Sequence, residues 1–457
     1  MKANFPHAKK TVLHITSHLG GGVGSVLSKV SLTRKRNESP IEDVFACLEP
    51  PEKKETVSAM RAGGLDVHIC PNESEMKHLI RNADVVQLEW WHHPLLTKFM
   101  CENKIKARLL VWSHTSGLSY PDVPIQFVYT PHAFLFTSPV SHQNIERIGG
   151  IDTVHSSGGF DNIPMSKRPL KEGDLNYSYL GAPNFSKLHP RIVDFLTVVK
   201  TRGFRVHFYG DADANPKLHS DKIALRGFTT DPIGALMESD VLIYLLNPDH
   251  YGTTENALLE AMAAGVVPVV FNNPAEASIV KHKMTGMVVD SPPEFADAIT
   301  FLNDNRNALQ NMSMAASLDI RERFPLEKTI QGLDAHYRKL MLEEKKIFNF
   351  ASLFGNTPHS WFLSCIGKYG HFFTSATDNT LRLERLKHPV LYDQSKSSAF
   401  QFFKYFPHDK ILEQWVDMLK EDLHYEKELP VGNTLCTYFF QSIGENLKKM
   451  NILKVRK

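Results

Sequence analysis

The sequence predicts an α/β protein with two parallel-sheet domains and a mainly helical extension. Short apolar strands alternate with helical segments over residues 1–344, which is typical of β-α-β units. Residues 266–271 (VVPVVF) form a continuous apolar run, as expected for a strand that is buried on both faces of a parallel sheet. At 457 residues the chain is too long for one ordinary core, so we expect two domains and an extension.

Composition and charge exclude several classes of protein. A net charge of +2 and 22% charged residues are ordinary for a soluble protein and do not suggest a nucleic-acid binder, which would show a strongly basic face. The five cysteines are scattered and form no CxxC pair, which favours reduced thiols over a disulfide framework or a zinc site. No apolar run approaches the roughly 20 residues that span a bilayer, and no hydrophobic region follows the charged start MKANFPHAKK. We expect a cytoplasmic protein that reaches the inner membrane face only peripherally, if at all.

One stretch carries the signals of a helix that begins at a ligand-binding edge. Thr253 and Thr254 are placed as N-cap residues, and Glu255 falls in the first turn. Gly265 follows the last apolar residue, where helices commonly end. The helix starts in the loop after an expected strand at 240–246, at the sheet edge where α/β proteins bind their ligands.

Two features of this helix favour a nucleotide. Its N-terminus offers backbone N–H groups and the positive end of the helix dipole, both of which attract a phosphate. Glu260 lies further along the same helix, where a carboxylate can accept hydrogen bonds from the two neighbouring hydroxyls of a ribose. The pattern therefore predicts phosphate at the helix start and ribose at Glu260.

A glycine-rich segment near the N-terminus is a second candidate ligand site. The expected strand at 11–15 leads into SHLGGGVGSVLSKV, in which Gly21, Gly22 and Gly24 allow close approach of the backbone to a ligand. A helix expected from Ser25 adds N–H groups that suit a phosphate. The spacing is not GxGxxG, so a dinucleotide fold is weakly supported, and a plain tight turn remains the alternative.

The segments TENALLEAMAAGVVPVV and AEASIVKHKMTGMVV together resemble the donor-binding region of the retaining glycosyltransferases of family 4. The resemblance implies a GT-B fold, in which two Rossmann-like domains face a cleft and bind a nucleotide sugar without metal or cofactor. The family carries two glutamates separated by seven residues. Glu260 matches the second, Gly252 stands at the first, and either Asp249 or Glu255 is near enough to replace it.

The same resemblance assigns further residues. Lys187 matches a lysine that contacts the diphosphate, and Ala182 stands where the family has an arginine. His114 follows an expected strand at 107–112 and matches a histidine near the transferred sugar, with a purely structural histidine as the equal alternative. The candidate catalytic residues are thus His114, Asp249 and Glu255; the candidate donor-binding residues are Gly21, Gly22, Lys187, Thr253, Thr254 and Glu260.

Metal-binding patterns are weak. Asp211 and Asp213 form a DxD, which holds a metal in a different glycosyltransferase fold, but their place midway through the second domain favours a polar turn. His92 and His93 are adjacent and point in different directions on any regular element, so they make a poor metal pair. We therefore predict no metal site.

The expected domains are an acceptor-side domain at 1–160, a linker at 161–175 rich in proline, glycine and charge, and a donor-binding domain at 176–344. The last includes a helix at 326–344 that returns to the first domain. Residues 345–457 are rich in aromatics and histidine. We expect them to form a helical appendage packed on the main body, with a module for acceptor recognition or assembly as the alternative. Their basic tail is expected to be a solvated end, with a contact to an anionic membrane as the alternative.

The predicted function is transfer of a hexose-like sugar from a nucleotide sugar to a hydroxyl acceptor, with retention, in the synthesis of a polysaccharide or other glycan. The acceptor would be a glycan, a lipid-linked sugar or a small molecule. Two alternatives stay open: a nonenzymatic protein that binds sugar nucleotides or glycans, and a nucleotide-sugar epimerase. The donor sugar, the base and the acceptor depend on loop shape, which sequence patterns do not reach.

Overall fold

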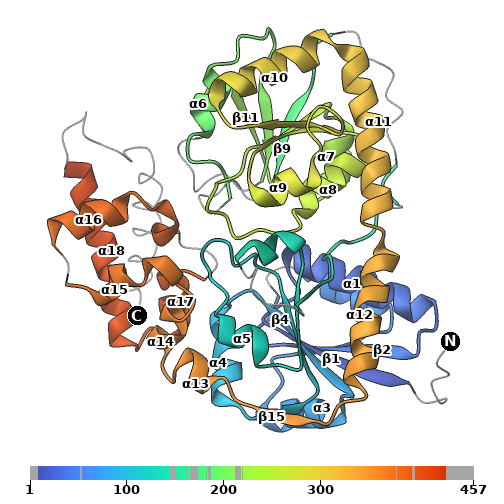
Figure 1. Cartoon of the computed structure of the whole chain (residues 1–457), viewed down its shortest axis with the longest axis vertical. Coiled ribbons are helices and arrows are strands. Elements are labelled where there is room, and N and C mark those ends of the chain that lie inside the picture. Colours follow the sequence, from blue (N-terminus) through green and yellow to red (C-terminus); the bar gives the residue numbers. More distant parts are fainter. Residues whose placement is uncertain are drawn as a thin grey trace.

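Figure 1 shows the computed structural model of the chain, in which one α/β domain lies above another and a helical extension packs beside the lower one. The structure describes residues 9–51, 54–144, 151–160, 162–164, 173–181, 183, 187–210, 218, 220–376, 378–393 and 397–428. Within these residues, no helix is long and apolar enough to cross a membrane.

The first domain is built on a seven-stranded parallel sheet with the order β3-β2-β1-β4-β6-β7-β8. Its strands are β1 (Lys10–Thr16), β2 (Ile41–Cys47), β3 (Asp66–Ile69), β4 (Val85–Trp90), β6 (Leu109–Ser113), β7 (Ala133–Phe136) and β8 (Asp152–Thr153). Its helices are α1 (Gly21–Arg36), α2 (Glu55–Ala62), α3 (Glu73–Asn82), α4 (Pro94–Glu102), α5 (Ile125–Tyr129) and η1 (Pro139–Asn144). The strand order reverses between β1 and β4, so the ligand-binding switch point lies at their carboxyl ends.

Alternate residues of this sheet enter two separate cores. In β1, Val12 belongs to the core formed with helices α1, α2 and α12 (Leu326–Leu340), whereas Leu13 and Ile15 belong to the core formed with α3, α4 and α5. Both faces are therefore covered, as a parallel sheet requires.

The second domain is built on a six-stranded parallel sheet with the order β11-β10-β9-β12-β13-β14. Its strands are β9 (Tyr177–Leu180), β10 (Val206–Tyr209), β11 (Ile223–Gly227), β12 (Val241–Tyr244), β13 (Val267–Phe271) and β14 (Met287–Val289). Its helices are α6 (Ile192–Thr197), α7 (Pro232–Met237), α8 (Asn256–Ala263), α9 (Pro274–Ile279), α10 (Pro292–Asp304) and α11 (Arg306–Arg323). Pro268 is tolerated in β13 because the ladder to β14 begins after it, at Val269.

The chain returns to the first domain through two consecutive helices. Helix α11 packs on the second domain, and α12 runs down beside α1 of the first (Figure 1). Leu333, Tyr337 and Leu340 of α12 are buried in the core of the first domain. The helix predicted at 326–344 is thus present, with its end at Leu340.

The helical extension begins with a short strand that the sequence did not predict. Strand β15 (Lys346–Phe348) pairs antiparallel with β5 (Ile105–Ala107). The elements that follow are α13 (Ala351–Phe354), α14 (Pro358–Leu363), η3 (Gly367–Tyr369), α15 (His371–Thr374), α16 (Asn379–Leu386), η4 (Pro389–Tyr392), α17 (Ala399–Tyr405) and α18 (Lys410–Glu428). Phe354 stacks on Trp90 of β4, with ring centroids 5.5 Å apart. The extension therefore shares a core with the first domain.

Candidate active site between the two domains

The loop before α8 differs from the sequence prediction. The helix begins at Asn256, with Glu255 as its N-cap residue, and not at the predicted Thr253 and Thr254. Both threonine side chains are instead bonded to Thr137 of the first domain: the two hydroxyl oxygens of Thr137 and Thr253 lie 2.6 Å apart, and the Thr254 hydroxyl donates to the Thr137 carbonyl over 2.9 Å. The threonines therefore link the two domains, because tertiary contacts outweigh local capping preference.

Glu255 is held in a strained and buried position. Its φ of 23° lies in a region that side-chain-bearing residues seldom adopt. Its carboxylate accepts hydrogen bonds from the Lys187 ammonium and, over 2.7 Å, from the Tyr244 hydroxyl. Burial alone would raise the pKa of Glu255, but the charges of Lys187 and His250 lower it to about 2. The site thus keeps an ionised carboxylate out of water.

The space beside Gly252 is filled by the same carboxylate. A Cβ atom built on Gly252 would collide with Oε1 of Glu255. Asp249 points elsewhere: its side chain is 43% exposed, and its carboxylate lies 3.9 Å from the ammonium of Lys368 in the helical extension. Of the two carboxylates that the sequence left open, Glu255 is the one that occupies the volume of a side chain at position 252.

A further carboxylate completes this cluster. Nε2 of His250 lies 3.0 Å from Oε1 of Glu276, which is fully buried on α9. Burial lowers the pKa of His250, but Glu276 and Glu255 outweigh it and raise the pKa. Sequence reasoning did not select Glu276, although it lies within the segment AEASIVKHKMTGMVV.

The glycine segment is the first turn of α1 and not a separate loop. The helix begins at Gly21, ahead of the predicted Ser25, and among the described residues no side chain caps it. A Cβ atom on Gly22 would lie 3.2 Å from Nδ2 of Asn256, the first residue of α8. The N-termini of α1 and α8 therefore meet across the domain boundary, with two sets of helix-start N–H groups in one place.

Glu260 lines a groove between the two domains. The groove has a volume of about 770 Å³ and is also lined by Ser25 and Lys29 of α1 and by Pro232 at the start of α7. Among the described residues the carboxylate of Glu260 has no hydrogen-bond partner. Burial raises the pKa of its carboxyl, although Lys29 opposes the shift. The carboxylate is thus available to a ligand.

His114 follows β6 and lies on the first domain's side of the boundary. Its Nε2 lies 2.8 Å from Oε2 of Glu89, a fully buried residue of β4. The loop after it also touches the second domain, because the Ser116 N–H donates to the Tyr251 carbonyl over 3.1 Å.

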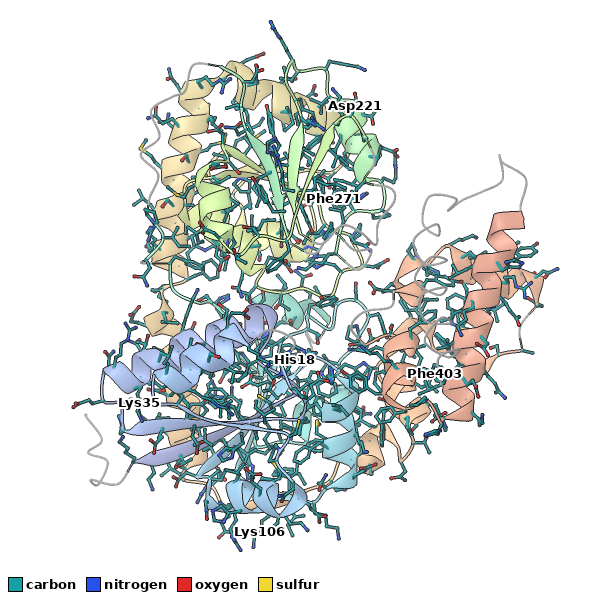
Figure 2. The ribbon with its side chains drawn as sticks, turned by 180° about the vertical axis from the view of Figure 1, so that it is seen from behind. His18, Lys35, Lys106, Asp221, Phe271 and Phe403 are labelled. Atoms are coloured by element: carbon teal, nitrogen blue, oxygen red, sulfur yellow. The ribbon has the colours of Figure 1, made fainter. Side chains whose placement is uncertain are left out.

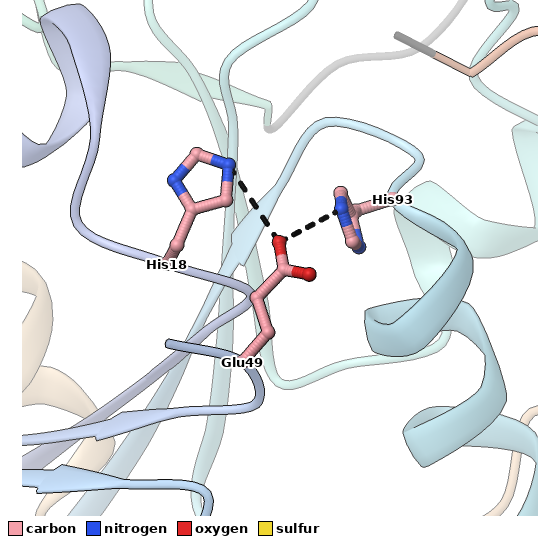
Figure 3. Close-up of side chains that lie close together, drawn as sticks. All are labelled: His18, Glu49 and His93. Atoms are coloured by element: carbon pink, nitrogen blue, oxygen red, sulfur yellow. Dashed lines mark ion pairs between the residues drawn. The ribbon is translucent and has the colours of Figure 1, made fainter. Parts of the chain in front are cut away.

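Three side chains in the first domain have the composition of a metal site (Figure 3). Nε2 of His18 and Nε2 of His93 lie 3.9 and 3.3 Å from Oε1 of Glu49. However, Nδ1 of His18 accepts the N–H of Gly20, and Nδ1 of His93 accepts the N–H of Leu95. In each neutral ring Nε2 then carries the proton. A metal would need a lone pair on each of these Nε2 atoms. The arrangement instead fits two N–H groups that face the carboxylate of Glu49. His18 lies where the first domain faces the second (Figure 2).

Known proteins share part of this sequence and the arrangement of the two domains. Residues 183–305 match the family described as glycosyl transferases group 1. A glycosyltransferase of Rickettsia africae has 15% identity and a TM-score of 0.56, and covers 73% of this chain and 99% of its own. HepE of Anabaena in complex with UDP has 12% identity and a TM-score of 0.58, and covers 72% of this chain and 100% of its own. The chain has the GT-B fold.

A curated relative matches a smaller part. The putative glycosyltransferase YtcC of Bacillus subtilis is 29% identical over 92 residues, which is 20% of this chain and 23% of that protein. The chain thus matches about a quarter of the length of this relative.

The GT-B arrangement gathers most of the predicted residues at the domain boundary. Gly22 meets the start of α8, Lys187 pairs with Glu255, Thr253 and Thr254 contact the first domain, and Glu260 lines the interdomain groove. Asp249 instead faces the extension. The predicted DxD at Asp211 and Asp213 lies outside the described residues, as does Ala182.

Proposed function

We propose that this protein is a glycosyltransferase that moves a sugar from a nucleotide-sugar donor to a hydroxyl of an acceptor. The observation that carries the proposal is the meeting of two helix N-termini, at Gly21 and Asn256, beside Lys187; no side chain of the described residues caps either one. Together these groups supply hydrogen-bond donors and positive charge for a diphosphate. The match to group 1 glycosyltransferases supports it, and so do the GT-B neighbours described with UDP and with UDP-glucose.

In this proposal the diphosphate lies between the starts of α1 and α8. Lys187 turns from Glu255 towards the phosphates, since their charge competes for the same ammonium. Glu260 accepts hydrogen bonds from the ribose hydroxyls. No other group among the described residues is hydrogen-bonded to its carboxylate. The buried anion of Glu255 then faces the sugar rather than the phosphates, because like charges repel.

The reaction breaks the bond between the anomeric carbon and the diphosphate oxygen and forms a bond to the acceptor oxygen. The proton of the acceptor hydroxyl passes to the departing diphosphate oxygen on the same face, and a nucleoside diphosphate leaves. We propose that Lys187 and the helix starts stabilise the negative charge that grows on the leaving oxygen, without a metal. Attack from the face that the diphosphate leaves would give retention. Contact between the domains would exclude water and limit hydrolysis of the donor.

The acceptor would lie on the first domain, against the carboxyl ends of β1 and β4. Glu49 and His18 are partly exposed there, and the ring of Trp91 lies 5.5 Å from that of His18. The extension contributes to the same place, since the Tyr405 hydroxyl donates to Oε2 of Glu49 over 2.5 Å. A carboxylate beside an aromatic ring suits a hydroxyl-rich acceptor, such as a glycan, a lipid-linked sugar or a small molecule.

The first test is a thermal-shift screen of the protein against nucleoside diphosphates and nucleotide sugars, with and without magnesium. A ligand that binds only the native state raises Tm. We expect one nucleotide series to raise Tm without magnesium, and the corresponding nucleotide sugar to release nucleoside diphosphate when acceptors are added. Binding without release across a broad acceptor panel would favour the nonenzymatic alternative. Conversion of the donor sugar without an acceptor would favour an epimerase.

A further inference from the structure

A row of polar side chains interrupts the core between the first sheet and the helices α1 and α12. The row consists of His14 on β1, Asp43 on β2, and Gln87 and Glu89 on β4, each no more than 3% exposed. Their neighbours on the same sheet face, such as Val12 and Phe45, are apolar. Burying an ion costs several kcal/mol unless an opposite charge and hydrogen bonds compensate for the lost water. These side chains therefore destabilise the core unless they pair with one another.

His14 connects two carboxylates. Its Nδ1 lies 2.8 Å from Oε1 of Glu89, and its Nε2 lies 3.1 Å from Oδ1 of Asp43. Since both ring nitrogens face carboxylate oxygens, the ring donates from both and is an imidazolium. Burial lowers the pKa of His14, but the two carboxylates outweigh it and raise the pKa to about 8. Burial raises the pKa of Glu89, but His114 and His14 lower it to about 2.

The other oxygen of Glu89 determines the state of His114. An ionised carboxylate can only accept a hydrogen bond, so Nε2 of His114, 2.8 Å from Oε2, must carry a proton. In the neutral ring Nδ1 then holds the lone pair. Among the described residues Nδ1 has no hydrogen-bond partner. The atom is not completely buried, so a ligand can reach it. His114 thus presents an accessible acceptor nitrogen at the end of β6.

Helix α12 restrains the same carboxylate through Gln87. The Tyr337 hydroxyl donates to Oε1 of Gln87 over 2.6 Å, and Nε2 of Gln87 donates to Oε1 of Glu89 over 2.8 Å. Glu89 therefore accepts three hydrogen bonds, from Gln87, His14 and His114.

A second route from α12 passes through Arg34. Its guanidinium donates to Oδ1 of Asp43 over 2.8 Å and to Oδ1 of Asp334 over 2.5 Å. Asp43 in turn faces His14, the partner of Glu89. The docking of α12 thus fixes the orientation of Glu89 from two sides.

We propose that Glu89 is a positioning residue for His114: it fixes the Nε2–H form of the ring and so presents Nδ1 to a hydroxyl of the transferred sugar. The inference rests on the proposed function, because the sugar is that of the proposed donor. If the network were purely structural, it would hold the helices and strands together, but the tautomer of His114 would not affect the rate of sugar transfer.

The substitution Glu89→Gln separates these two roles. The amide oxygen can still accept from His14 and Gln87, which leaves the amide N–H group facing His114. Nε2 of His114 must then accept, and the proton moves to Nδ1. The Nδ1 lone pair that would bind the sugar hydroxyl is lost. We expect kcat/KM for transfer to fall by about tenfold to a hundredfold.

The decisive measurement is nitrogen NMR of protein labelled in its histidine rings, with His114→Gln used to identify the His114 signals. We expect Nε2–H in the wild type and Nδ1–H in Glu89→Gln. The matched control is Glu75→Gln, because Oε1 of Glu75 lies 2.6 Å from Nδ1 of the partly exposed His68; it should change neither the His114 signals nor the rate. A folded Glu89→Gln with His114 still in the Nε2–H form would overturn the proposal, as would an unchanged kcat/KM.

The substitution Glu89→Asp covers the case in which Glu89→Gln does not fold. It keeps the buried charge but withdraws the carboxylate by one methylene, so the contact with His114 opens. We expect both ring forms of His114 to appear; a ring that stays wholly Nε2–H would refute the proposal. A wild-type protein that transfers no sugar would defeat the proposed function, while the ring spectra would still decide whether Glu89 sets the form of His114.

Discussion

Each domain brings a buried, ionised carboxylate to the ligand-binding edge of its sheet, but the two are used differently. Glu255 of the second domain is bonded to Lys187, whose side chain is 21% exposed, so a charged group stands beside the proposed diphosphate site. Glu89 of the first domain is fully buried, and reaches the boundary only through the ring of His114. Glu255 thus places a charged pair next to a ligand, whereas Glu89 stays inside and acts through the ring of His114.

The largest expected effect comes from Lys187→Met. The substitution removes the charge next to the proposed diphosphate and leaves the carboxylate of Glu255 buried without its cation. We expect turnover to fall about a hundredfold to a thousandfold and the free energy of unfolding to fall by about 3 kcal/mol. Donor kinetics and urea unfolding measure the two effects. Lys187→Arg keeps the charge and should lose less of both; a Lys187→Met protein that binds nucleoside diphosphates as the wild type does would refute this role.

A matched pair of substitutions tests which carboxylate serves the site. Glu255→Gln removes the anion beside Gly252, and we expect kcat to fall about a hundredfold, as for the loss of one electrostatic contact to the transition state. Asp249→Asn changes a residue that faces Lys368, and kcat should stay within about twofold. Steady-state rates with a saturating donor compare the two. The reverse order of effects would assign the role to Asp249.

The buried charges of the first domain predict a pH effect on stability. The folded pKa of His14, about 8, is above its ordinary value of 6.5, so the protonated ring stabilises the fold. This contribution is complete below about pH 6.5 and is lost as the pH rises through 8; its size is about 2 kcal/mol. Urea unfolding of the wild type and of His14→Gln, at several pH values, isolates it from other groups. Parallel stability curves for the two proteins would show that His14 is not protonated in the fold.

The smallest expected effect on the empty protein comes from Glu260→Ala. Because the carboxylate of Glu260 has no hydrogen-bond partner among the described residues, its removal should leave the free energy of unfolding unchanged or raise it by up to about 1 kcal/mol. Binding of a nucleoside diphosphate should weaken about tenfold, as for a lost charge-assisted hydrogen bond. Binding of inorganic diphosphate, which has no ribose, serves as the control and should not change. Equal losses for both ligands would place Glu260 on the phosphates instead.

The helix boundaries show where sequence patterns stop being sufficient. Capping preference predicted a start at Thr253, but both threonines bond to Thr137, which lies 116 residues away from Thr253. The sequence predicted a glycine loop followed by a helix from Ser25, yet the helix begins at Gly21. Gly24 is required there, since a Cβ atom would collide with the carbonyl oxygen of Leu19. At α8 a contact distant in sequence outweighed local preference, whereas at α1 the glycine is needed for close packing within the turn that begins the helix.

The sequence by itself determined the α/β class and the buried parallel strands, because hydrophobic periodicity is a local property of the chain. The helix signals at 253–260 are local too, whereas Lys187 is a candidate only through the family resemblance, and the donor-binding role of these residues stays a prediction. Only the tertiary structure decided that Glu255 fills the place beside Gly252, that Glu276 joins it, and that Glu89 holds His114. The last network joins β1, β2, β4, α1 and α12, whose residues Arg34 and Asp334 are 300 positions apart. A buried charge is stable only where such partners converge, and that convergence follows from the packing of the sheet and helices.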